Sequence, residues 1–92
     1  MSVLYRFSPT NLTLERHNEV NRRLTEAGVW PAPGCELHVV FGPDSDLRVS
    51  QIWSSDEEFE AFGPHLQPIL EEVGVELAGP PERFEVTTLE RY

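Results

Sequence analysis

The chain has 92 residues, 39% of them hydrophobic and 25% charged, which is ordinary for one globular domain covering residues 1–92. Its formal net charge of −9 opposes binding to nucleic acid and to anionic membrane surfaces. All seven basic residues are arginines, so Schiff-base chemistry on a lysine and a P-loop are both excluded.

The sequence also disfavours a membrane span, a secretory signal, an internal disulfide and a resident metal. No apolar run approaches the roughly 20 residues needed to span a bilayer. The opening residues MSVLYRFSPT lack the basic and apolar regions of a secretory signal, so we expect a cytoplasmic location. Cys35 stands alone and excludes an internal disulfide, and the three histidines lack the short spacing of metal ligands, which predicts no resident metal.

The first half of the chain predicts a strand and a helix. Residues 2–7, SVLYRF, are apolar and aromatic and indicate a strand that ends at Ser8-Pro9. Thr13 is the expected N-cap of a helix that ends at Gly28. His17 lies on the apolar side of this helix, where we expect it to pack against the sheet; the apolar stripe itself is Leu14, Val20, Leu24 and Ala27.

The second half predicts a hairpin, a helix and a strand. Residues 36–41 and 47–53 flank the sequence GPDSD, which is typical of a turn between two strands. Ser55 and Glu58 form a capping-box pattern at the start of a second helix, and Gly74 ends it. Residues 83–90 indicate a last strand. The apolar stripe of the second helix is Phe59, Phe62, Leu66, Ile69 and Val73.

The stretch AFGPHLQPIL interrupts the second helix with Gly63, Pro64 and Pro68. Because the apolar stripe continues in phase on both sides, we expect a kink at Gly63 and a restart of the helix at Pro64. His65, next to the kink, is better explained as a partly exposed helix residue than as a catalytic group.

The resulting order, β-α-β-β-α-β, predicts an α+β fold of the ferredoxin-like type, with an antiparallel four-stranded sheet and both helices on one face. The other face of such a sheet should be polar, yet the strands are apolar on both sides. In the second strand, for example, Leu37, Val39 and Phe41 alternate with His38 and Val40. An apolar face of this kind predicts a homodimer formed sheet against sheet.

The strand end QIWSSDEEFEAF, the later PILEEVGV and the order of elements resemble the dimeric α+β barrel superfamily, which contains the antibiotic-biosynthesis monooxygenase-like domains. The resemblance covers nearly the whole chain and is strongest to small actinobacterial-type members. It implies a homodimer with a cavity between each sheet and its helices, or within the joint barrel. It also implies a small apolar or aromatic ligand and no flavin or other cofactor.

Haem-degrading relatives carry an asparagine at the end of the first strand, a tryptophan in the second helix and a histidine ten residues later. On this chain those positions fall near Arg6, at Phe62 and at Glu72. None of the three matches, so the resemblance does not extend to haem degradation.

The strongest candidate for chemistry is His38. The hairpin that turns at GPDSD places it opposite Gln51, on the face that also carries Val40, Val49 and Trp53. A histidine and an amide among apolar side chains are typical of a small-molecule site, where His38 would act as a general base oriented with Gln51. A buried histidine satisfied across a dimer interface explains the same pattern equally well. The candidate ligand-binding residues are Tyr5, Phe7, Val40, Val49, Trp53 and Phe62.

Two functions therefore stay open. The chain is a cofactor-independent, monooxygenase-like enzyme acting on a small apolar or aromatic molecule, or it is a non-catalytic homodimer with a ligand-binding or structural role. A cavity of a few hundred cubic ångströms lined by His38 would favour the enzyme. A solidly packed interface would favour the alternative.

Overall fold

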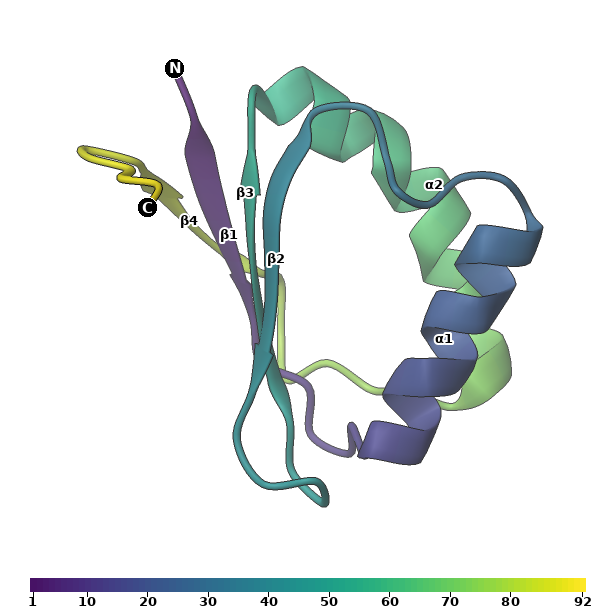
Figure 1. The fold of residues 1–92 in the computed structure, drawn as a ribbon. Helices are drawn as coiled ribbons and strands as arrows, with labels where there is room; N and C mark the ends of the chain where they lie inside the picture. The colour runs from purple at the N-terminus through teal and green to yellow at the C-terminus, as the bar shows by residue number, and fades with distance from the viewer.

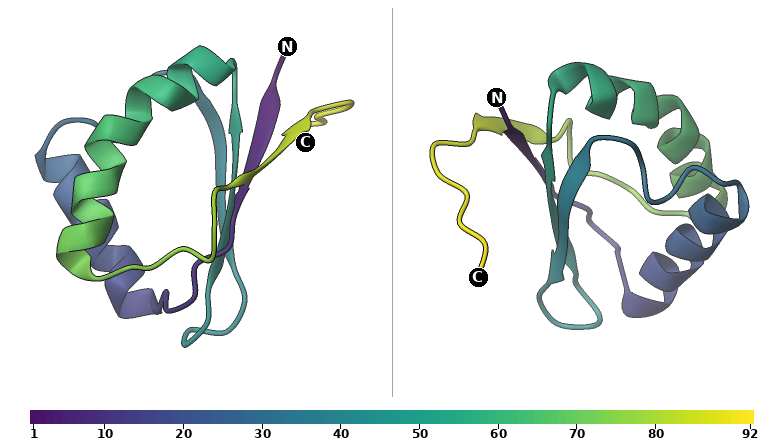
Figure 2. Two further views of the ribbon diagram at one scale, coloured as in Figure 1. Left: turned by 180° about the vertical axis from the view of Figure 1, so that it is seen from behind. Right: turned by 45° about the horizontal axis from the view of Figure 1, so that its top comes forward.

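The expected order of elements is confirmed in a computed structural model that describes all 92 residues. The strands are β1 (Val3–Phe7), β2 (Cys35–Phe41), β3 (Arg48–Trp53) and β4 (Glu82–Glu85), and the helices are α1 (Leu14–Glu26) and α2 (Asp56–Val73). The strands form one antiparallel sheet in the order β2-β3-β1-β4. Both helices cover the same face of that sheet, as Figures 1 and 2 show. The α+β, ferredoxin-like fold class is therefore confirmed.

Helix α1 begins and ends as its caps predict. The Thr13 side chain accepts a hydrogen bond from the backbone N–H of Arg16, and Gly28 follows the helix with a φ of 74°. Of the expected stripe, Val20 and Leu24 are buried, but Leu14 and Ala27 are exposed. Leu14 precedes Val20 by six residues, which turns it about 120° away from the buried side. Ala27 is the C-cap, beyond the last buried turn.

The hairpin of β2 and β3 has the expected register. His38 pairs with Gln51, and Gln51 pairs on its other side with Tyr5 of β1. Paired residues point to the same face of a sheet, so these three side chains form a row beneath the helices. The row places polar groups at the centre of an otherwise apolar layer.

Helix α2 runs without interruption through Gly63 and Pro64, so the expected restart is not seen. The helix instead curves around the sheet (Figures 1 and 2). Pro64 and Pro68 both lie on its exposed side, where their missing N–H groups leave the hydrogen bonding of the convex face incomplete. Phe62 is buried on the opposite side, and the rest of the predicted stripe packs against the core.

Strand β4 is shorter than expected, four residues in place of residues 83–90. Its partner β1 begins at Val3, which pairs with Glu85, and one more backbone hydrogen bond joins Val86 to Ser2. Beyond that point the chain has no strand beside it. Residues 87–90 therefore have no neighbouring strand to pair with, and the prediction of a strand over residues 83–90 was wrong.

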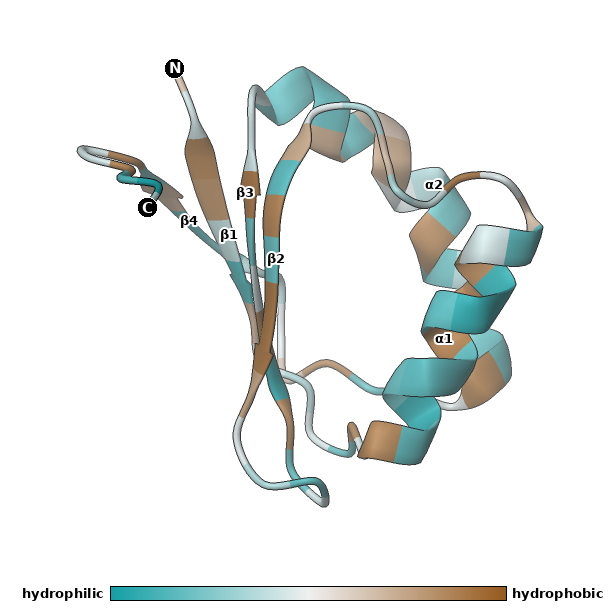
Figure 3. Cartoon of the chain, in the orientation of Figure 1, coloured by the Kyte–Doolittle hydropathy of each residue, from teal (hydrophilic) through white to brown (hydrophobic).

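The sheet has one covered face and one open face. On the covered face Val3, Tyr5 and Phe7 of β1 are buried under the helices. On the open face Phe84, Leu4, Ile52 and Leu37 are paired across all four strands, and Val39 and Phe41 continue along β2. We call these six residues the open apolar face. Figure 3 shows hydrophobic stretches along β1, β2 and β3.

Candidate functional site

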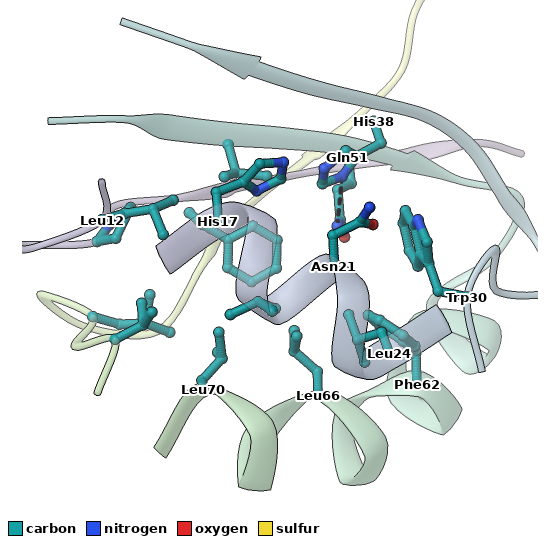
Figure 4. A pocket seen from close by; sticks show the side chains of 16 residues that line it. Leu12, His17, Asn21, Leu24, Trp30, His38, Gln51, Phe62, Leu66 and Leu70 are labelled. Atoms are coloured by element: carbon teal, nitrogen blue, oxygen red, sulfur yellow. Dashed lines mark hydrogen bonds between the residues drawn. The ribbon is translucent and has the colours of Figure 1, made fainter. Parts of the chain in front are cut away.

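A pocket lies between the sheet and the two helices (Figure 4). Its volume is about 70 Å³, and 11 of its 16 lining residues are hydrophobic. Such a volume holds a few water molecules, since one needs about 10–15 Å³. The lining residues are Phe7, Pro9, Leu12, His17, Val20, Asn21, Leu24, Trp30, His38, Val49, Gln51, Phe62, Leu66, Leu70, Val75 and Leu77.

A chain of hydrogen bonds connects the core to this pocket. The indole N–H of Trp53 donates to Oε1 of Gln51 at 3.0 Å, and Nε2 of Gln51 lies 3.0 Å from Nδ1 of His38. Trp53 is fully buried and Gln51 is 4% exposed. The expected meeting of His38 and Gln51 is therefore present, and it extends through the amide to Trp53. If His38 acted as a general base, it would accept the proton at Nδ1 or at Nε2. Nδ1 already contacts the Gln51 amide.

His17 joins this group from α1. Its ring stacks on that of His38, with centroids 5.8 Å apart and an interplanar angle of 14°. Burial lowers the pKa of His17, and burial together with the neighbouring His17 lowers the pKa of His38. Both rings are therefore neutral at pH 7, the form in which imidazole can accept a proton.

Two more side chains complete the mouth of the pocket. Trp30, in the loop after α1, lies edge-on to His38 with ring centroids 5.1 Å apart, and it also contacts Phe62. Asn21 projects from α1 toward Gln51 and His38 (Figure 4). The site thus combines aromatic and aliphatic walls with two imidazoles and two amides, a composition typical of small-molecule pockets.

The residues expected to bind a ligand divide into two groups. Phe7, Val49 and Phe62 line the pocket together with His38 and Gln51. Tyr5, Val40 and Trp53 lie outside its lining.

Tyr5 has a structural environment of its own. It stacks on Phe59, with ring centroids 3.6 Å apart, and its hydroxyl donates to Asp56 at the start of α2. Arg83 of β4 binds the same carboxylate through two hydrogen bonds of 2.8 Å. Burial, with the Asp56 carboxylate, raises the pKa of Tyr5 to about 12. Tyr5 therefore ties β1 to α2 and β4.

Sequence reasoning did not assign His17, Asn21 or Leu24 to the site. Together with Val20 they follow the spacing 17, 20, 21, 24, which is one face of a helix. The signal was therefore available as two polar residues within an apolar stripe. For Trp30 the sequence leaves two places open, the rim of a cavity or the end of the first helix, because its position depends on the path of a proline-containing loop. In the structure Trp30 lines the pocket.

His65 lies elsewhere. It is exposed and borders a separate hollow between α2 and the loop after α1, together with Glu58, Phe62 and Ala32. No group of three histidine, cysteine, aspartate or glutamate side chains is placed to hold a metal ion. Neither helix has the length and hydrophobicity that crossing a membrane requires.

No family model and no curated protein matches this sequence. Solved structures do. A cofactor-independent oxygenase, SnoaB of Streptomyces nogalater, matches with a TM-score of 0.61 and 16% identity over 96% of this chain and 93% of its own. A Deinococcus radiodurans protein named as an antibiotic-biosynthesis monooxygenase matches with a TM-score of 0.62 and 13% identity, covering 100% and 98% of the two chains.

The chain has the same fold as these two proteins. A third structure agrees with this assignment: the ActVA-Orf6 monooxygenase of Streptomyces coelicolor, in complex with nanaomycin D, with a TM-score of 0.52. Its identity is 18%, over 99% of this chain and 88% of its own. The resemblance to the dimeric α+β barrels is thus confirmed at the level of fold, which by itself does not determine a reaction.

Proposed function

We propose that this protein binds a small apolar or aromatic molecule between its sheet and helices and oxidises it as a cofactor-independent, monooxygenase-like enzyme. The observation that carries the proposal is the pocket: two neutral imidazoles and the amide of Gln51 meet inside an otherwise apolar lining. Groups of this kind can remove a proton from a bound molecule and stabilise the resulting anion.

The fold supports the same proposal. One protein of similar structure is a cofactor-independent oxygenase, and another was solved with the ligand nanaomycin D. An electron-rich carbanion or phenolate can react with oxygen directly, so the protein's task is to create that anion in a dry site. His17, His38 and Gln51 are the polar groups we assign to forming and stabilising this anion, with Phe7, Val49 and Phe62 forming apolar walls.

Anthrone, an aromatic ketone with an acidic CH₂ group, provides a test. With O₂ it yields anthraquinone and one molecule of water, and the reaction can be followed by oxygen uptake and by absorbance. We expect the protein to accelerate this oxidation and the His38→Ala variant to lose about 10²–10⁴-fold in rate, the usual contribution of a group that transfers a proton or stabilises the resulting anion. His65→Ala is the matched control and should keep full activity. No acceleration by the wild type, or equal activity of His38→Ala, would contradict the proposal.

The size of the pocket favours a second candidate, a protein that binds a small ligand without turnover. Its volume of about 70 Å³ is well below the roughly 300 Å³ at which drug-sized pockets begin. Anthrone would enter only if half-buried side chains at the mouth, such as Trp30, move aside. Native mass spectrometry of freshly purified protein separates the candidates: a retained small molecule that is not consumed under O₂ would favour binding alone.

We also propose that the protein forms a homodimer through the open apolar face. Leu37, Val39, Phe41 and Phe84 are each 40–48% exposed there, on a sheet whose other side is already covered. A second copy can cover this face through a two-fold interface in which each residue is used twice. The pocket lies on the opposite side of the sheet, so dimer formation leaves its entrance free.

A further inference from the structure

We propose that Trp53, acting through Gln51, holds His38 in the tautomer that carries its hydrogen on Nε2, so that His38 donates a hydrogen bond to the ligand while His17 accepts the ligand's proton. The proton transfer rests on the proposed function. The tautomer is a property of the protein alone and can be tested without a substrate.

The first step is the orientation of the Gln51 amide. An indole N–H can donate a hydrogen bond but cannot accept one, so the group facing Nε1 of Trp53 at 3.0 Å must be the oxygen of the amide. Trp53 is fully buried and has no alternative partner in solvent. The amide nitrogen is consequently directed at His38.

The second step is the tautomer of His38. Nδ1 lies 3.0 Å from the Gln51 nitrogen, which is a donor, so Nδ1 must present a lone pair. In a neutral ring the hydrogen is then on Nε2. A proton on Nδ1 would face the N–H of Gln51, and turning the amide to accept it would break the bond to Trp53. His38 is therefore suited to donate from Nε2 and poorly suited to accept a proton.

The third step concerns His17. No protein group forms a hydrogen bond with either of its ring nitrogens, and no buried side-chain nitrogen or oxygen in the chain lacks a partner, so these nitrogens reach the pocket or solvent. His17 and His38 are the only titratable side chains in the lining, which draws on both helices, three strands and the loops. No carboxylate or guanidinium there competes for the proton, and the stacked rings disfavour two positive charges.

The resulting chemistry is a simple proton transfer. A hydroxyl or enol of the ligand gives its proton to a ring nitrogen of His17, which becomes an imidazolium. The bonding electron pair stays on the ligand oxygen, and this oxyanion accepts a hydrogen bond from Nε2–H of His38. The arrangement selects ligands that pair an apolar ring with an acidic O–H, such as a phenol or the enol of an aromatic ketone.

Long-range ¹H–¹⁵N NMR of the histidine rings in the unliganded protein tests the tautomer directly. We expect the hydrogen of His38 on Nε2. In Gln51→Glu the carboxylate accepts where the amide donated, and the hydrogen should move to Nδ1. A wild-type ring with its hydrogen on Nδ1, or one that does not respond to Gln51→Glu, would overturn the proposal.

The same spectra, recorded as the pH is lowered, test the roles of the two rings. His17 should take up a proton before His38; the reverse order would contradict the assignment. If anthrone is turned over, His17→Gln should lose about 10²–10⁴-fold, whereas His38→Gln, whose amide N–H can replace the donor, should lose less than His38→Ala. Equal losses for both His38 variants would refute the donor role. Absence of turnover with the expected tautomer would count against the proposed function alone.

Discussion

Gln51 shows how one side chain can serve both the core and the site. It is the buried polar residue of the sheet, and its amide supplies the acceptor that Trp53 needs and the donor that His38 receives. A leucine of similar size would leave the indole N–H unpaired in the core, which costs about 1–3 kcal/mol. The amide therefore stabilises the core at one end, and at the other it meets His38 in the pocket.

The two histidines should make stability depend on pH. Burial lowers the pKa of both rings, whereas in the unfolded chain a histidine titrates near 6.5. Below about pH 6.5 the unfolded state therefore binds more protons than the folded state, and the free energy of unfolding should fall as the pH drops from 7 to 5. Urea denaturation across that range measures the slope.

The histidine variants provide the comparison. His17→Gln should flatten the slope, because one of the two groups that favour the unfolded state at low pH is gone. His65→Ala removes an exposed histidine and should leave the slope close to that of the wild type. A urea midpoint that rises as the pH is lowered from 7 to 5 would show that the rings bind protons more readily in the folded state than in the unfolded state. That result would contradict the burial seen in the structure.

For single residues, the sequence predicted contacts correctly where a local pattern determines the geometry. The turn GPDSD sets the register of the hairpin, so the pairing of His38 with Gln51 could be predicted. The hydrogen bond from Trp53 to the Gln51 amide could not be predicted, because it depends on side-chain conformations that only the packed core determines. His17 and Trp30 reach the pocket from other elements, which no hairpin rule describes.

At the scale of elements, the ends of the helices were predictable and their shape was not. Thr13 and Ser55 cap the helices as expected, because capping depends on neighbouring residues alone. The Glu58 side chain, however, binds Ser54 rather than completing the capping box. The curvature of α2 follows from the core that it covers as much as from its prolines.

Helix α2 leads to a prediction about Pro64. Replacing it with alanine restores an N–H that can donate to the carbonyl four residues earlier and removes a poor helix former from the helix interior. Because Pro64 is exposed, nothing in the core is lost, and we expect the free energy of unfolding to rise by about 1 kcal/mol. Chemical denaturation measures it. Pro68→Ala, one turn later on the same side, is the matched comparison.

A loss of several kcal/mol on Pro64→Ala, as large as a core truncation, would mean the opposite. The bend would then be needed to bring Leu66 and Leu70 onto the sheet, and straightening the helix would open the pocket that they line. A change in pocket binding alongside the loss of stability would identify that cause.

At the scale of the whole molecule, the two faces of the sheet have different tasks. The helix-covered face holds the core and the pocket. The open face carries six apolar residues with no helix over them, of which Leu37, Val39, Phe41 and Phe84 are 40–48% exposed. The double-sided pattern could be read from the alternation along β2. The sequence could not predict which face the helices cover, because His38 and Val40 on one face are no more hydrophobic than Leu37 and Val39 on the other.

The last prediction is the homodimer. Sedimentation equilibrium at micromolar concentration should return about twice the chain mass of 10.5 kDa. Leu37→Glu places a charge in the open apolar face, twice in a two-fold dimer, and should shift the protein toward monomer. Leu14→Glu is the matched control, because Leu14 is 42% exposed and Leu37 44%, but Leu14 lies at the start of α1. Leu14→Glu should stay dimeric. A monomeric wild type, or a dimer that Leu37→Glu leaves intact, would show that this face is not the interface.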